Sequence, residues 1–275
     1  MSLNPDAMWP LSKDPGAMRV IVLNSGSNGN AVFVESVESG HALLFDCGIS
    51  RKQIELRLQA HKRSLSNVLG IFLTHEHGDH VRGLPTLTKL HRIPTYLTEG
   101  TYQGLRKYRS DTEFHIISNN DSVDIGEFTV FSRPKSHDAR DPVYFELLSG
   151  NKRFVYATDL GVAGNDFPDS LRMADAVMLE SNYDEEMLNN GPYPEYLKAR
   201  IRSGKGHLSN KQSMDLLRDH CNGRLSMLIF AHLSENNNRP ELVQRELDTL
   251  LQLRPEFRPR VHIASRRTVS EVFTV

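Results

Sequence analysis

The chain has 275 residues, of which 39% are hydrophobic and 24% are charged, and its formal net charge is −1. Such a chain buries a large core, and its balanced charge excludes a global field that draws it to nucleic acid or to a membrane surface. No apolar stretch reaches the roughly 20 residues of a membrane helix.

The N-terminal segment and the cysteines bear on location. Residues 1–17 have neither the basic start nor the apolar core of a secretion signal. Cys47 and Cys221 fit no zinc-ribbon or redox spacing, which is typical of reduced thiols. We therefore expect a soluble, cytoplasmic protein with a flexible tail at residues 1–17 and a single domain at residues 18–275.

The first half of the chain is predicted to consist of strands with helices between them. Ser50 is a candidate N-cap for a helix that ends near His61. Apolar residues at three-residue intervals after the fourth strand predict a short helix over 81–90. Apolar runs predict the strands 19–23, 31–34, 42–45 and 68–73, with a glycine-bearing turn after the first.

The second half repeats this pattern. Strands are predicted at 128–131, 143–148, 153–157, 176–179 and 226–231, the last of these as the final core strand. Helices are predicted at 196–202 and 209–220. Since strands and helices alternate without a low-complexity linker, we expect one α/β domain.

The segment Thr74–His80 is the most informative part of the sequence. It follows the apolar run 68–73 and reads Thr-His-Glu-His-Gly-Asp-His. Imidazole and carboxylate groups are ligands that zinc and similar cations accept. Three of the chain's 12 histidines fall within six positions here, which argues against a chance polar loop. Because His75 and His77 face one way and Asp79 and His80 another, the segment favours two cations over one.

Polar residues stand just past the ends of several other apolar strands. Side chains at such positions converge on one rim of a packed sheet, where α/β proteins usually bind ligands. Taken singly, a histidine in such a place is more often a surface residue, and an aspartate is often a helix cap. Their recurrence predicts one convergent site. The residues are Asp46, His75, His137, Asp159, Glu180 and His232.

This ordered set resembles the motifs of the metallo-β-lactamase superfamily, from Met18 onward. The resemblance implies a four-layer αββα sandwich with a dinuclear metal site at one edge of its two sheets. It implies that Asp46 orients a ligand, and Glu76 is expected to point away from the metals. One ion would take His75, His77 and His137, the other would take Asp79, His80 and His232, and Asp159 would bridge them.

The segment Gly206–Asn210, ahead of His232, looks like a segment of the tRNA-processing endonuclease branch of this superfamily. That likeness implies that His207 protonates the leaving oxygen or steadies the scissile phosphate. The alternative is that His207 only caps the helix that begins near Ser209. We predict His207 and Asp79 as the catalytic residues.

More closely, the chain resembles the YycJ/WalJ group of small bacterial hydrolases, which implies exonuclease action on double-stranded DNA. Tyr183 departs from the histidine expected there. The motifs that carry the likeness lie at 25–30, 74–80, 136–139, 157–161, 179–182, 190–194, 206–210 and 232–237.

These features predict a metal-dependent phosphodiesterase or nuclease in which two divalent cations, about 3.5–4 Å apart, hold the attacking hydroxide. Zinc is the first expectation, with Mn²⁺ or Fe²⁺ as alternatives. The other functions considered are hydrolysis of a cyclic phosphodiester, thioester or lactone, and a regulatory role with structural metals.

Nucleic acid is the predicted partner, although the basic clusters equally fit a solvated surface. Backbone N–H groups of the loop 25–30 are candidate phosphate donors, or the loop is a plain hairpin turn. The candidate basic residues are Arg106, Lys107, Arg109, Lys198, Arg200, Arg202, Lys205, Arg266 and Arg267.

Overall fold

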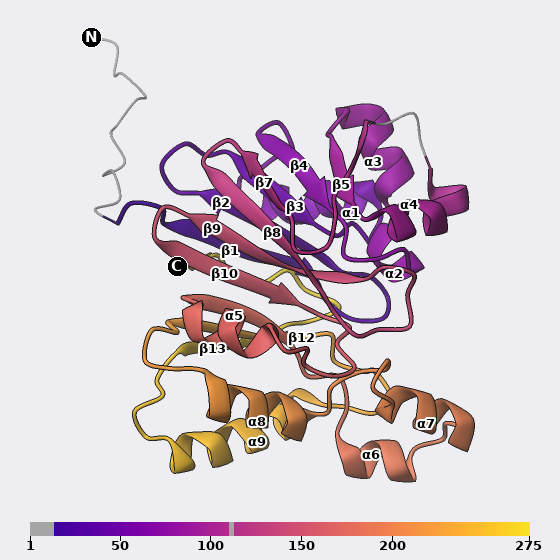
Figure 1. Ribbon diagram of the computed structural model, residues 1–275, viewed down its shortest axis with the longest axis vertical. Helices are drawn as coiled ribbons and strands as arrows, with labels where there is room; N and C mark the ends of the chain where they lie inside the picture. The colour runs from indigo at the N-terminus through magenta and orange to yellow at the C-terminus, as the bar shows by residue number, and fades with distance from the viewer. Residues whose placement is uncertain (1–13, 110–112) are drawn as a thin grey trace.

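The computed structural model describes residues 14–109 and 113–275. Within them, two mixed sheets pack face to face and helices cover both outer faces, which gives four layers (Figure 1). The first sheet has the order β14 (Phe273–Thr274), β1 (Met18–Asn24), β2 (Ala31–Ser36), β3 (Ala42–Phe45), β4 (Val68–Phe72), β5 (Thr95–Leu97) and β6 (Phe114–Ile116). The second has the order β13 (Arg260–Ile263), β12 (Met227–Ala231), β11 (Ala176–Glu180), β10 (Lys152–Ala157), β9 (Val143–Ser149), β8 (Phe128–Pro134) and β7 (Ser122–Ile125).

The helices fall into three groups. Those of the first half are α1 (Arg51–Ala60), α2 (Gly78–Val81), α3 (Leu84–His91) and α4 (Glu99–Leu105), followed by a 3₁₀ turn at Arg106–Tyr108. Below the second sheet lie α5 (Phe167–Met173), α8 (Asn210–His220) and α9 (Pro240–Leu253) (Figure 1). The remaining pair, α6 (Glu185–Asn190) and α7 (Glu195–Arg202), lies beyond the same end of the sandwich as α2 (Figure 1).

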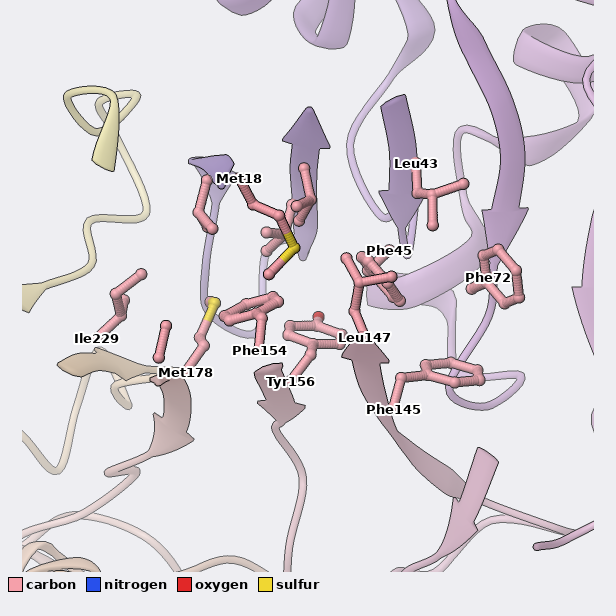
Figure 2. Close-up of a cluster of buried hydrophobic side chains, with 14 of the residues drawn as sticks. Met18, Leu43, Phe45, Phe72, Phe145, Leu147, Phe154, Tyr156, Met178 and Ile229 are labelled. Carbon is pink, nitrogen blue, oxygen red and sulfur yellow. The ribbon is translucent and has the colours of Figure 1, made fainter. Parts of the chain in front are cut away.

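The main core lies between the sheets. Figure 2 shows Phe45 and Phe72 of the first sheet turned toward Phe145 and Tyr156 of the second. The ring centroid of Phe45 lies 5.7 Å from each of the other three. Each fully buried aromatic ring stabilises the fold by about 1.5–3 kcal/mol. Separate apolar layers join each sheet to its helices.

Parallel strand pairing sets up the functional edge. Strands β3, β4 and β5 run parallel in the first sheet, as do β10, β11, β12 and β13 in the second. Parallel neighbours end at the same edge of a sheet, so the residues that follow them are gathered together. The two edges meet. The hydroxyl of Tyr156, near the end of β10, donates to Oδ2 of Asp46, just beyond β3, at 2.9 Å.

The α/β sandwich predicted from the sequence is confirmed, and the predicted strands and the Ser50-capped helix are present. Two details were wrong. The strand 226–231 is not the last, because β13 pairs with it. The helix predicted over 81–90 is two helices, because Pro85 lies in the first turn of α3 and has no backbone N–H to continue a helix from α2.

The predicted tail is described only in part, since residues 1–13 lie outside the described residues. Ala17 is buried, and Asp14 forms a 2.7 Å ion pair with Lys152. Asp14 and Ala17 therefore lie against the rest of the fold, and the flexible tail and the single domain stay predictions. Cys47 and Cys221 are buried free thiols. In the described part of the chain, no helix combines the length and the hydropathy needed to cross a membrane.

Candidate metal centre

The metal-binding motif is held by the turn between β4 and α2. Its backbone is fixed from two other loops: Asn30 N–H donates to the Asp79 carbonyl at 2.7 Å, and Cys47 N–H donates to the His80 carbonyl at 2.8 Å. His75 and His80 are fully buried. Burial and backbone anchoring together fix where the four candidate ligands of this motif point.

The first cluster consists of His75, His77 and His137. The ring centroid of His75 lies 4.6 Å from that of His77 and 4.9 Å from that of His137, and each residue offers a ligand atom within 4.8 Å of the others. This is the set expected for one ion.

The second cluster consists of Asp79, His80 and His232. Asp79 Oδ2 lies 3.7 Å from the Nε2 atoms of both histidines. Asp159 stands between the two clusters, with Oδ2 at 3.1 Å from His80 Nε2 and Oδ1 at 3.8 Å from His137 Nε2. The structure therefore brings all seven predicted ligands together in the expected grouping, with Asp159 where a bridging carboxylate belongs.

Hydrogen bonds to the Nδ1 atoms orient the histidine rings. Asp46 Oδ2 lies 2.8 Å from His80 Nδ1, and the Gly206 carbonyl lies 3.1 Å from His137 Nδ1. Asp46 also accepts from the backbone N–H and the hydroxyl of Thr74. Because the Nδ1 atoms are occupied, Nε2 of each ring faces the centre, as carboxylate or carbonyl partners of metal-bound histidines usually ensure. Asp46 thus lies where an orienting residue is expected.

Glu180 is a functional residue to which the sequence reasoning assigned no role. Its Oε1 lies 2.8 Å from both His232 Nδ1 and His207 Nδ1, while Oε2 accepts from the backbone N–H groups of Leu160 and Leu208. One buried carboxylate therefore positions a predicted metal ligand and the predicted acid together. The available signal was its place directly at the end of β11.

His207 does not cap a helix. Ser209 is the N-cap of α8, in a capping box with Gln212, so the alternative interpretation of His207 is wrong. With Nδ1 on Glu180, its Nε2 is free to act, and the ring centroid lies 5.3 Å from those of both His137 and His232.

The donor atoms fit divalent cations. His75 Nε2 and His232 Nε2 are buried and have no hydrogen-bond partner among the described residues, while the buried Asp159 Oδ2 lies 3.1 Å from His80 Nε2. Leaving buried polar atoms unpaired costs about 1–3 kcal/mol each, so the two nitrogen atoms indicate a missing partner. They belong one to each cluster, where imidazole and carboxylate ligands suit zinc, manganese or iron.

The carboxylates dominate the electrostatics of the site. Burial alone lowers the pKa of His80, but Asp46, Asp159 and Asp79 outweigh it and raise this pKa to about 10. Burial likewise raises the pKa of Glu180, yet the neighbouring His207 and His232 bring it down to about 2. The ionised carboxylates create a negative potential that attracts cations.

Three of the site residues have left-handed backbone conformations that non-glycine residues rarely adopt. The φ angles are 56° at Asp46, 54° at Asp159 and 56° at His232. Asp46 and His232 directly follow the last residues of β3 and β12, and Asp159 follows the last residue of β10 after one intervening residue. Such conformations cost of order 1–3 kcal/mol and persist where surrounding structure enforces them, commonly at functional sites.

Several predicted contacts with phosphate have structural roles. In the loop 25–30, the Gly26 N–H donates to Asn30 Oδ1 and the Gly29 N–H to the Gly26 carbonyl, so these two donors are taken. Lys198 is buried, with Nζ on the Asn189 carbonyl and on Glu195, so its assignment to a phosphate was wrong.

Glu76 accepts from the Arg140 N–H and belongs to no ligand cluster, as expected.

The other basic residues differ in whether their side chains are already paired within the protein or are exposed. Arg200 is bound to Asp138, and Arg266 pairs with Glu235. Arg202 bonds to Asn189, and Arg109 packs on the Tyr102 ring. The side chain of Lys107 lies outside the described residues. Arg106, Lys205 and Arg267 are exposed.

Comparison with known proteins identifies the class of this fold and site. Residues 41–230 match the model of the beta-lactamase superfamily domain, so the chain belongs to that superfamily. The metallo-β-lactamase fold protein YhfI from Bacillus subtilis superposes with a TM-score of 0.71 at 17% identity, covering 94% of this chain and 100% of its own. The short form of human tRNase Z superposes at 0.62 with 17% identity, covering 92% of this chain and 98% of its own.

Within the superfamily, the chain belongs with YycJ and WalJ. It is 33% identical to exodeoxyribonuclease YycJ of Bacillus anthracis over 84% of this chain and 88% of the relative. It is 32% identical to exodeoxyribonuclease WalJ of Streptococcus pneumoniae serotype 2 over 80% of this chain and 83% of the relative. The family resemblance read from the motifs is confirmed.

Proposed function

We propose that this protein is a metal-dependent hydrolase that cleaves phosphodiester bonds in DNA, as an exonuclease. The observation that carries the proposal is the paired cluster of seven ligands joined by Asp159, with His207 at its edge. The names of the YycJ and WalJ relatives support DNA as substrate. A cytoplasmic location stays a prediction.

Two divalent cations, with zinc as the first candidate and manganese or iron as alternatives, would supply Lewis acidity and an activated water molecule. His75, His77 and His137 would hold one, Asp79, His80 and His232 the other, and Asp159 would contact both. Carboxylate and imidazole ligands whose buried donor atoms have no hydrogen-bond partner among the described residues suit cations that must also bind substrate.

His207 acts as the general acid in this proposal. Nδ1 of the protonated imidazole would donate to Glu180, and Nε2 would give its proton to the leaving oxygen as the bond between phosphorus and that oxygen breaks. Glu180 stabilises the charged imidazolium before this transfer. Asp79, a predicted ligand whose side chain is partly open to solvent, has Oδ2 at 3.7 Å from Nε2 of both His80 and His232, close enough for all three to bind one ion.

The test is a nuclease assay on the purified protein loaded with Zn²⁺ or Mn²⁺. End-labelled duplex DNA, single-stranded DNA, RNA, bis-p-nitrophenyl phosphate and a thioester are offered in parallel, and bound metal is measured by elemental analysis. We expect digestion of DNA that is lost in His77→Ala and Asp79→Ala. Thioester turnover without cleavage of any phosphodiester would instead identify a small-molecule hydrolase.

A further inference from the structure

Lys135 is a buried cation to which the proposed chemistry gives no part. It directly follows β8 and stands two positions before the predicted ligand His137. Only 7% of the residue is exposed. Its Nζ donates to the Thr158 carbonyl over 2.7 Å, and Thr158 directly precedes Asp159, the predicted bridge between the two ligand clusters. The ammonium group therefore lies inside the protein, next to the metal centre.

The hydrogen bond alone does not account for a lysine at this position. Its acceptor is a neutral backbone carbonyl, which an uncharged N–H donor serves as well. Lysine is almost never fully buried unless it is paired, because removing an ammonium group from water is costly without opposite charges nearby. The charge of Lys135 therefore needs compensation from the groups around it.

The acids of the metal centre supply that compensation. Burial lowers the pKa of Lys135, and four carboxylates act against this effect. Carboxylates that share one buried site repel one another while no cation is present. A fixed positive charge within reach of all four reduces this repulsion, so it stabilises the metal-free site. The four acids, in order of their effect on Lys135, are Asp159, Asp46, Glu180 and Asp79.

The same positive charge reaches the place where the first ion is expected. Burial lowers the pKa of His75 and of His137, and the charge of Lys135 lowers the pKa of both further. A charge that opposes a proton on these imidazoles also opposes a metal ion bound to them, because both are positive. Lys135 thus favours the metal-free site over the loaded one.

We propose that Lys135 is a built-in counter-ion of the metal centre, which stabilises the metal-free protein and lowers its affinity for the ions. The inference rests on the proposed metal-dependent function, and it concerns how tightly the ions are held rather than which bond is cleaved. A residue that stabilises the free state more than the loaded state must weaken binding by the same free energy. Removal of the charge should therefore tighten metal binding.

The test changes Lys135 and leaves every predicted ligand in place. Lys135→Met keeps the length of the side chain, Lys135→Gln keeps an N–H donor without the charge, and Lys135→Arg keeps the charge. Lys89→Met is the matched control, because Lys89 is exposed on α3. The affinity for Zn²⁺ or Mn²⁺ is measured by competition with a coloured chelator. Melting temperatures are measured with excess chelator and with excess metal.

We expect Lys135→Met and Lys135→Gln to bind metal about 5–150-fold more tightly than the wild type, the range typical of coupled sites. The melting temperature of both variants should fall more in chelator than in metal. Lys135→Arg and Lys89→Met should keep the affinity of the wild type. A lysine that only supported packing would lower both melting temperatures alike and would not tighten metal binding.

Unchanged or weaker metal binding in Lys135→Gln overturns the inference. So does tighter binding in Lys135→Arg that equals that of Lys135→Gln, since loss of the charge would then not be the cause. These two variants decide the outcome even if Lys135→Met does not fold. A wild type that binds metal and cleaves no phosphodiester refutes the proposed function and leaves this inference standing. A wild type that binds no divalent cation refutes the metal centre itself.

Discussion

At the scale of single residues, the Glu180 carboxylate contacts both the predicted metal ligand His232 and the predicted acid His207. In Glu180→Gln, one amide replaces an oxygen that accepts from two histidines, so His207 and His232 lose their shared anion. Removing such an orienting partner costs about 10–100-fold in metal affinity or activity. We expect a loss of this size in kcat/KM with bis-p-nitrophenyl phosphate. Glu186→Gln, an exposed change on α6, should match the wild type; equal activity in both variants would refute the role of Glu180.

His207 should be separable from the metal ligands. In His207→Ala, both ligand clusters keep their donor atoms, so bound metal should be unchanged. Loss of a general acid lowers the rate by about 10²–10⁴-fold. The loss should be smaller with a p-nitrophenyl ester than with DNA, because nitrophenolate leaves without a proton. Elemental analysis and parallel rate measurements check this, and an equal loss on both substrates would contradict acid catalysis.

The sequence placed Glu180 at the site together with the candidate ligands, but its role could not be predicted, for a physical reason. Four ligands are neighbours in one segment, and the other three each follow an apolar strand, so the chain itself displays them. Glu180 acts through His207 and His232, which are 27 and 52 positions away. The parallel register of β11 and β12 brings His232 to Glu180. The loop before α8 brings His207 there, and it is held by the Leu208 N–H that donates to Glu180.

At the scale of elements, the metal motif is fixed by the close approach of two turns. Gly48, in the turn after β3, packs against Asp79, in the segment after β4. A Cβ on Gly48 would overlap the backbone carbonyl of Asp79. Forcing extra atoms into packed structure costs about 1–3 kcal/mol. Gly48→Ala should therefore lower both stability and metal content, although Gly48 binds no metal. Thermal unfolding and elemental analysis measure the effect.

Gly164→Ala provides the control for that experiment, because a Cβ there meets nothing within 4 Å. It should leave metal content and melting temperature near those of the wild type. A Gly48→Ala protein with full metal content would show that the Asp79 turn moves freely, contrary to the packing seen here.

The strands that sequence patterns missed are short or lie at sheet edges, and the patterns also missed several helices, including the 14-residue α9. Strands β5 and β6 have three residues each, and β14 has two, so periodicity has too few positions to show. Strand β13 is only half-buried, because it lies at an edge of its sheet. The strands β3, β11 and β12, which lead to site residues, are buried on both faces and read as continuous apolar runs. Strand β8, before His137, instead alternates between buried and half-buried residues over most of its length.

At the scale of the whole molecule, the predicted metal ligands come from both halves of the sandwich. The first sheet supplies His75, His77, Asp79 and His80 beyond β4, and the second supplies His137, Asp159 and His232 beyond β8, β10 and β12. A ligand that binds only the folded state stabilises it by RT ln(1 + [L]/Kd), which is about 2.7 kcal/mol at a hundredfold excess over Kd. Cations bound to both sheets should therefore stabilise the complete domain.

Removal of metal by a chelator should lower the melting temperature in one cooperative transition, and added Zn²⁺ or Mn²⁺ should restore it. The shift should vanish in His75→Ala, because this variant lacks a buried ligand of the first cluster. It should persist in His220→Ala, whose side chain lies in the last turn of α8, outside the ligand clusters. Thermal unfolding by circular dichroism is measured for the wild type and both variants, after chelation and after metal is added back. If chelation melts only one part of the protein, or if His75→Ala responds like the wild type, the ions do not hold the two sheets together.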